Sequence, residues 1–167
     1  MIRAALFLWI AATISSCGYK LLEPGVGAGA TISVPPSENP TRWRGAEVSF
    51  TSALRKDLQR LLHLRFSSEN PDYILRSSIQ EIRRGAPVRS KIGGAIVGTA
   101  TVVLTWTLEN SHGETFSGGS LEQTLEYLPS EDEDEKQAIE EILDWMAESV
   151  VIKVHADFTS VANDKNG

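Results

Sequence analysis

The 167-residue sequence has little of the chemistry on which catalytic and metal sites depend. It contains one cysteine, so an internal disulfide is excluded. Its three histidines, His63, His112 and His155, do not stand at the spacing of metal ligands. No serine lies in the Gly-x-Ser-x-Gly motif of a hydrolase nucleophile, which argues against a periplasmic hydrolase. The sequence therefore predicts no metal, no cofactor and no catalytic residue, and we expect that it is not an enzyme.

The chain also lacks an excess of positive charge and an apolar run long enough to cross a bilayer. Its 16 basic and 22 acidic side chains give a net charge of −6. A general nucleic-acid binder needs a basic surface and is excluded. The apolar segment 4–14 is interrupted only by Thr13, but a membrane-spanning helix needs about 20 residues.

That apolar segment is typical of a signal peptide, because Arg3 precedes it and two small serines follow it. Residues 14–17 (ISSC) look like a bacterial lipobox, in which the cysteine thiol receives a diacylglyceryl group and the chain is cleaved before it. We therefore expect a signal peptide over 1–16 and lipidation of Cys17. The alternatives are an ordinary signal peptide with a chance cysteine, or an uncleaved anchor.

A lipidated Cys17 anchors the chain to a membrane, since two or three acyl chains bind stably where one does not. Gly18 follows the cysteine, which favours the outer membrane over the inner. The glycine-rich residues up to 30 then read as a flexible tether, so that the lipidated cysteine and tether together occupy 17–30. We expect a single folded domain over 31–161 and a disordered tail over 162–167.

Hydrophobic periodicity predicts the order strand, helix, strand, strand, strand, helix. The strands are expected at 31–34, 72–82, 99–108 and 114–128, and the helices at about 45–64 and 130–158. The fold class is α/β (α+β): a two-layer sandwich of two helices on a mostly antiparallel four-stranded sheet.

Several local features are expected within these elements. Uneven alternation in 72–82 indicates either a bulge or a strand buried partly on both faces, and Gly118-Gly119 indicates a bulge. Ser130 and Glu133 form a capping box for the last helix, and the acidic run 131–135 is explained by that cap and by solubility.

The tryptophans and the first helix carry further expectations. Val48 begins the buried face of that helix, and Trp106 and Trp145 fit buried faces. Trp43 either anchors an interface or holds the start of the first helix against the core.

Basic residues collect in the predicted loop 83–97, and no acid occurs between positions 83 and 91. They are Arg83, Arg84, Arg89 and Lys91. Arginine binds phosphate through paired hydrogen bonds and lysine as a point charge. Beside apolar residues of the same loop, they suit an amphiphile with an anionic head and an acyl tail. One alternative is a solvated loop that happens to be basic. Another is insertion of the loop into a protein partner, which exposed apolar residues also suit.

The chain resembles the LptE family of lipopolysaccharide-assembly lipoproteins over nearly all of its mature length. The residues that carry the resemblance are Cys17-Gly18-Tyr19-Lys20-Leu21, the strand with Ile32 and Val34, the helix with Glu47, Asp72-Tyr73-Ile74-Leu75, the hairpin of 99–108 with Gly113, and the long last helix.

The resemblance implies two helices on a mostly antiparallel sheet, placed as a plug inside a large outer-membrane β-barrel, LptD. It implies a non-enzymatic role in barrel assembly and lipopolysaccharide binding, by a lipid-anchored protein that faces the periplasm. It places the loop 83–97 near the lipopolysaccharide contact. The rival interpretation is a general envelope lipoprotein, structural or transport, that binds another protein or an apolar ligand.

Overall fold

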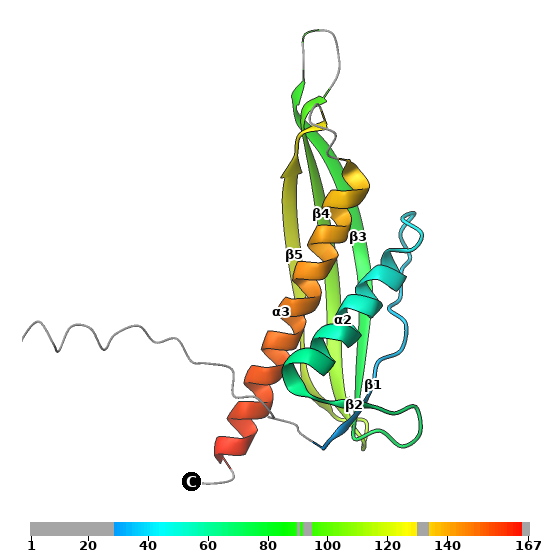
Figure 1. Cartoon of the computed structure of the whole chain (residues 1–167), viewed down its shortest axis with the longest axis vertical. Helices are drawn as coiled ribbons and strands as arrows, with labels where there is room; N and C mark the ends of the chain where they lie inside the picture. The colour runs from blue at the N-terminus through cyan, green and yellow to red at the C-terminus, as the bar shows by residue number, and fades with distance from the viewer. Residues whose placement is uncertain (1–28, 90, 92–94, 130–133, 165–167) are drawn as a thin grey trace, which may run out of the picture.

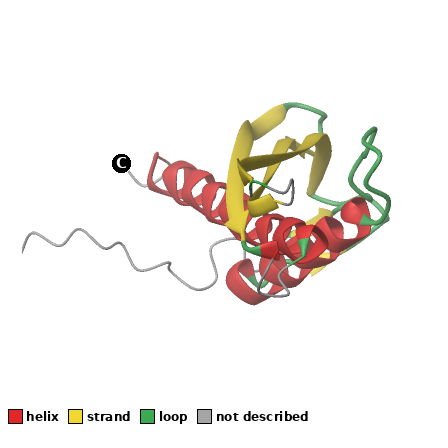
Figure 2. Ribbon diagram, turned by 90° about the horizontal axis from the view of Figure 1, so that it is seen from above, coloured by secondary structure: helices red, strands yellow, loops and turns green. Residues whose placement is uncertain are grey.

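The computed structural model describes residues 29–89, 91, 95–129 and 134–164. Its elements are β1 (Thr31–Ser33), α2 (Ala46–Leu62), β2 (Arg65–Phe66), β3 (Tyr73–Arg89), β4 (Ala95–Asn110), β5 (Thr115–Tyr127) and α3 (Glu135–Asp164). The strands form one sheet in the order β2-β1-β3-β4-β5, and both helices lie on the same face of it (Figure 1). Seen from above, the strands form one layer and the helices the other (Figure 2). This two-layer α+β sandwich confirms the predicted fold class.

The predicted four-stranded, mostly antiparallel sheet is wrong in its strand number and in part of its pairing. The sheet has five strands, and β1 pairs in parallel with both β2 and β3. The pairs β3 with β4 and β4 with β5 are antiparallel, as expected. β2 was not predicted because its two residues are too few to show an alternating pattern.

The core lies between the helices and the apolar face of β4. Alternate residues of β4 from Ala100 to Leu108 are buried, which confirms the strand predicted from their alternation. The predicted apolar stripe of α3 is also buried along its length, from Ala138 to Phe158. Burial of these apolar residues of β4 and α3 between the sheet and the helices supplies the main stabilisation of the domain.

Two predictions of burial are wrong. Val48 on α2 is 67% exposed and Trp145 on α3 is 42% exposed. Phe50 fills the core on α2 instead, at four-residue spacing from Leu54. Trp145 lies about 140° around the helix from the centre of the buried stripe, at roughly 100° per residue.

The bulge predicted in 72–82 is confirmed. The register of β3 against β4 shifts between Ile79 and Glu81. Ile79 then faces Leu104 and Ile82 faces Val102, so both isoleucines share the helix-covered face although their numbers differ in parity.

The bulge predicted at Gly118-Gly119 is wrong, because the register of β5 against β4 is regular there. Gly118 serves a close approach of the two strands instead, whereas Gly119 has room for a methyl group. A Cβ on Gly118 would lie 3.1 Å from the Trp106 carbonyl oxygen, and one on Gly119 would lie 3.5 Å from Trp106 Nε1.

The ends of α3 differ from the expected ones. The Asp134 carboxylate accepts a hydrogen bond from the Gln137 backbone N–H at 2.6 Å and caps the helix. The helix continues to Asp164, past the expected end near Phe158 and into the segment 162–167 predicted to be a tail. The predicted capping box, Ser130 with Glu133, lies outside the described residues, as do the signal peptide, Cys17 and most of the tether.

β1 is fastened to the start of β3 by one carboxylate. Asp72 Oδ2 accepts hydrogen bonds from the backbone N–H and the hydroxyl of Thr31, both at 2.8 Å. The Asp72 N–H in turn donates to the Thr31 hydroxyl at 3.0 Å. The Thr31 N–H, followed by its hydroxyl, holds the pKa of Asp72 below its ordinary value of 3.8.

This contact predicts a pH dependence local to β1. A lowered carboxyl pKa stabilises the fold above the unfolded-state value and loses that contribution as the pH falls through the folded value. We expect the protection of the Thr31 amide, relative to its intrinsic exchange rate at each pH, to decrease as the pH falls below 3.8. Asp72→Asn should remove this pH dependence, and an NMR titration that placed the Asp72 pKa at or above 3.8 would contradict the assignment.

Candidate functional site

The predicted basic loop 83–97 is mostly strand, which corrects the expectation from the sequence. β3 continues to Arg89, β4 begins at Ala95, and these two residues still face each other across the hairpin. The strands were not predicted because Gly85 and Pro87 interrupt any apolar alternation. Pairing between the backbones of β3 and β4 extends the two strands up to Arg89 and Ala95, and the sequence shows no pattern for such pairing. We refer to residues 83–97 as the projecting hairpin.

The projecting hairpin extends past the rest of the sheet. β5 pairs with β4 no further than Gly98, and the last bridge on the other side of β3 joins Glu38 to Ser78. Within the described chain, the hairpin beyond these points has no neighbouring strand. Figure 1 shows β3 and β4 continuing beyond the end of β5.

Two close contacts at glycines fix the base of the hairpin. The ring of Tyr127 lies directly on Gly98, where an added Cβ would stand 2.3 Å from its Cζ. On the partner strand, a Cβ on Gly85 would stand 2.6 Å from the Thr99 hydroxyl oxygen. A Cβ at either position would therefore displace the facing side chain, the ring of Tyr127 or the hydroxyl of Thr99.

Arg83 is engaged at the base on the helix-free face of the sheet. Its Nη2 lies 2.7 Å from Glu122 Oε1 on β5, and its Nε lies 3.4 Å from Glu81 Oε2. All three side chains are about half exposed, so these pairs add little to stability. They do offset the positive charge that Arg83 presents.

Arg84 points to the opposite, helix-covered face. Its Nη1 lies 3.5 Å from Glu135 Oε2 at the start of α3. Tyr127 lies beside this pair: burial raises the pKa of its hydroxyl, the Glu135 charge raises it further, and Arg84 lowers it. Within the described part of the chain, the buried Glu135 Oε1 accepts no hydrogen bond.

Lys91 stands at the end of the hairpin and is exposed. Among the described residues it has no acidic partner. Val88 nearby is 45% exposed, so a charge and an apolar side chain are presented together. The side chain of Arg89 falls outside the described residues. The four predicted cations are therefore divided: Arg83 and Arg84 are held by acids on opposite faces, and Lys91 is available at the end.

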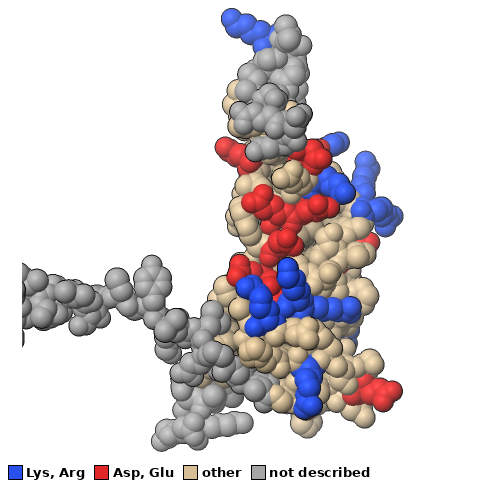
Figure 3. All heavy atoms as spheres, in the orientation of Figure 1, with Lys and Arg blue, Asp and Glu red and all other residues tan. Residues whose placement is uncertain are grey.

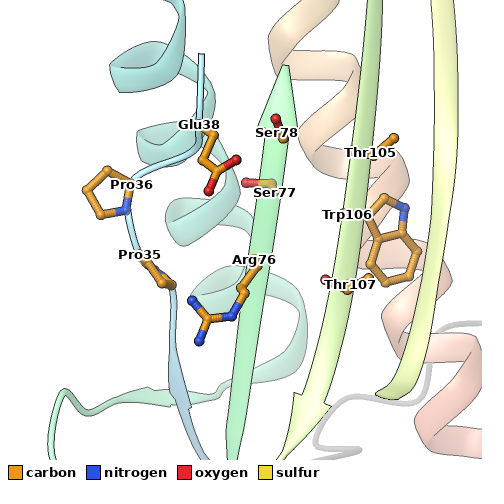
Figure 4. Close-up of a pocket in the computed structure, with 9 residues that line it drawn as sticks. All are labelled: Pro35, Pro36, Glu38, Arg76, Ser77, Ser78, Thr105, Trp106 and Thr107. Carbon is orange, nitrogen blue, oxygen red and sulfur yellow. The ribbon is translucent and has the colours of Figure 1, made fainter. Parts of the chain in front are cut away.

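A second feature is a hollow of about 290 Å³ on the helix-free face (Figure 4). Glu38, Arg76 and the hydroxyls of Ser78 and Thr105 line it, and Arg76 Nε lies 3.4 Å from Glu109 Oε2. Its walls include none of the four predicted cations. Pro35, Pro36 and Trp106 complete the lining, so the hollow is of mixed polar and apolar character.

Trp43 is half-buried and packs against the core ahead of α2. Its carbonyl oxygen accepts a hydrogen bond from Asn39 Nδ2 at 2.7 Å, and the same nitrogen donates to Glu47 Oε2 at 2.6 Å. The Asn39 amide is the main cause that lowers the pKa of Glu47. Trp43 thus fits the second of its two predicted roles, holding the helix start.

The described residues contain no group of three or more histidine, cysteine or acidic side chains arranged to hold a metal ion. None of the described helices has the length and hydropathy needed to cross a membrane.

Solved structures with this fold include three bacterial lipoproteins. Lipoprotein B from Nitrosomonas europaea has a TM-score of 0.56 and 14% identity, over 86% of this chain and 93% of that one. A minor lipoprotein from Acinetobacter baumannii has a TM-score of 0.51 and 18% identity, over 77% and 92%. Lipoprotein GNA1162 from Neisseria meningitidis has a TM-score of 0.51 and 13% identity, over 75% and 97%. At such low identity these similarities show the fold alone.

No curated protein matches this chain in sequence. The family model for lipopolysaccharide assembly, LptE, matches residues 29–154, which include every strand, α2 and most of α3. The match covers well over half of the chain, and so the chain belongs to the LptE family of lipopolysaccharide-assembly lipoproteins.

Proposed function

We propose that this protein is the plug and assembly partner of a large β-barrel translocon, similar to LptD, that inserts lipopolysaccharide into the outer membrane. The family match over residues 29–154 carries the proposal. The role is one of binding and assembly and involves no catalysis.

The length of the sheet supports a plug. β3 has 17 residues and β4 has 16, whereas strands usually have about 5–6. At about 3.3 Å per residue, β4 spans roughly 53 Å, which exceeds the 40–45 Å of a bilayer with its headgroups. A domain of this length can extend through the full height of a barrel lumen.

The projecting hairpin is the proposed contact for lipopolysaccharide. Arg83, Arg84, Arg89 and Lys91 would face the phosphates of the headgroup, since guanidinium and ammonium groups bind phosphate strongly. The exposed Val88 offers an apolar surface to the acyl chains. The Glu81, Glu122 and Glu135 carboxylates hold two of the arginines, so we assign the leading contact to the end of the hairpin.

The lipid on Cys17 is proposed to hold the domain at the periplasmic side of the outer membrane, after removal of residues 1–16. Gly29 lies twelve positions after Cys17, a reach of about 40 Å when fully extended. β1 lies at the end of the sheet opposite the projecting hairpin (Figure 1). The anchor therefore joins one end of the domain, and the hairpin is directed away from it.

Purification of the full chain from membranes tests the plug proposal. We expect a C-terminally tagged protein, extracted in a mild nonionic detergent, to bring with it one large outer-membrane barrel in equal amount. Mass spectrometry identifies the partner, and an unrelated tagged outer-membrane lipoprotein is the control. Recovery of the chain alone, or with a different partner, would overturn the proposal and favour a general envelope lipoprotein.

The anchor itself gives a further prediction. Cys17→Ala removes the only thiol that can be lipidated, and the chain should move from the membrane fraction to the soluble fraction. Ser16→Ala keeps a small residue before the cysteine and should behave like the parent. Retention of Cys17→Ala in the membrane, at the level of the parent, would indicate an uncleaved anchor instead.

A further inference from the structure

The outer surfaces of α2 and α3 leave a groove between them of about 540 Å³. The two helices lie side by side over the sheet (Figure 1), and the groove opens on the side away from it. Small side chains, among them Ser52 and Ala53, form much of the side of the groove that α2 contributes, so this side does not project far. The α3 wall carries Trp145.

Trp145 is a large aromatic side chain that is not part of the buried core. It is 42% exposed, whereas Leu143 and Met146 beside it on the same helix are fully or almost fully buried. An exposed indole within a groove offers a large apolar contact to a partner, and tryptophan is prominent among the residues that dominate binding energy at interfaces.

The groove is strongly acidic. Four carboxylates line it, those of Asp57, Glu140, Asp144 and Glu148, against the single ammonium of Lys56. Figure 3 shows acidic side chains gathered over the upper half of α3.

Cations on the same chain already occupy some of these acids. Arg60 Nη2 lies 3.0 Å from Asp57 Oδ1 and 3.5 Å from Glu148 Oε1. Lys136 Nζ lies 3.5 Å from Glu140 Oε1. Within the described residues, Asp144 forms no ion pair, although it is adjacent to Trp145 in the sequence. The groove thus presents an exposed indole and a neighbouring carboxylate that lacks a cation.

We propose that this groove docks a protein segment that presents an arginine, whose guanidinium stacks on Trp145 and pairs with Asp144. Guanidinium is planar, stacks on aromatic faces and matches a carboxylate, which an ammonium does less well. The excess of carboxylates disfavours phosphate-bearing ligands here, which separates this surface from the projecting hairpin. The docking groove goes beyond the proposed function and does not depend on it.

A fluorine NMR titration of the detergent-solubilised full chain, labelled with 5-fluorotryptophan, tests the proposal. Trp145→Phe identifies the Trp145 signal, and the signals of the other tryptophans, Trp43 and Trp106 among them, act as internal references. The probe is a capped tetra-arginine peptide, compared with tetra-lysine and with uncharged tetra-citrulline. We expect tetra-arginine to shift the Trp145 signal alone, with an affinity at least threefold above that of tetra-lysine, and tetra-citrulline to cause no shift.

Two variants separate the groove from general attraction to an acidic protein. Asp144→Asn should weaken tetra-arginine binding three- to tenfold, whereas Glu69→Gln, an exposed acid in another part of the chain, should leave it unchanged. Any of three results would overturn the proposal: no shift of Trp145 at millimolar tetra-arginine, an equal shift with tetra-citrulline, or equal effects of the two variants. A Trp145 shift caused by lipopolysaccharide micelles would also overturn it.

Discussion

Replacing Arg89 and Lys91 together with alanine should weaken lipopolysaccharide binding about 100-fold, and replacing Arg83 and Arg84 together should weaken it less than tenfold. A hydrogen bond to a charged group contributes about 1.5–3 kcal/mol, so the loss of two such contacts at the hairpin end amounts to about 3 kcal/mol. The other two arginines are already engaged by Glu122, Glu81 and Glu135, and their contribution to a ligand is correspondingly smaller.

Binding of purified lipopolysaccharide to the immobilised protein measures both pairs, and Arg42 with Arg44 provides a matched control. Those two arginines are exposed and precede α2, so their replacement by alanine should leave binding unchanged. The parent affinity should also fall as ionic strength rises, and less steeply in the Arg89/Lys91 variant, because salt screens exposed charges. Equal effects of the hairpin and control pairs would show that general charge, and not the hairpin, attracts the ligand.

Gly98→Ala should destabilise the domain by about 1–3 kcal/mol, the usual cost of forcing extra atoms into a packed site. The added Cβ would stand 2.3 Å from Tyr127 Cζ, and the ring must leave its place on the strand. Gly119→Ala is the matched control on the neighbouring strand. Its Cβ meets Trp106 Nε1 at 3.5 Å, an ordinary contact, and losing glycine freedom should stabilise the fold by about 0.4–1 kcal/mol.

Chemical denaturation followed by circular dichroism gives the free energy of unfolding for both variants. A double-mutant cycle identifies the cause of the Gly98 effect. If the clash with Tyr127 is responsible, Gly98→Ala should cost little in a Tyr127→Ala background. A cost that is the same in both backgrounds would assign the effect to the backbone.

Features set by local pattern could be predicted from the sequence. The alternating residues of β4 and the helical stripe of α3 placed the core correctly, since burial on one face imposes a period on the sequence. The bulge after Ile79 could be inferred because it restores Ile82 to the buried face. The exposure of Trp145 could also have been predicted from the sequence, because its angle around α3 places it outside the apolar stripe.

Features set by distant pairing could not be predicted. β2 forms by pairing with β1, and its two residues are too few to show an alternating hydrophobic pattern. Arg83 pairs with Glu122, which lies 39 positions later in the sequence, and Arg84 pairs with Glu135, which lies 51 positions later. The sequence showed four cations together, whereas strand alternation sends these two arginines to opposite faces of the sheet.

Photo-crosslinking in intact cells tests most directly whether the projecting hairpin contacts lipopolysaccharide. A benzophenone amino acid replaces Lys91 at the hairpin end or, as the control, Lys56, an exposed lysine on α2. We predict a lipopolysaccharide adduct from position 91 and none from position 56. The absence of an adduct at position 91, or equal adducts at both positions, would contradict the assignment of the hairpin as the lipopolysaccharide contact.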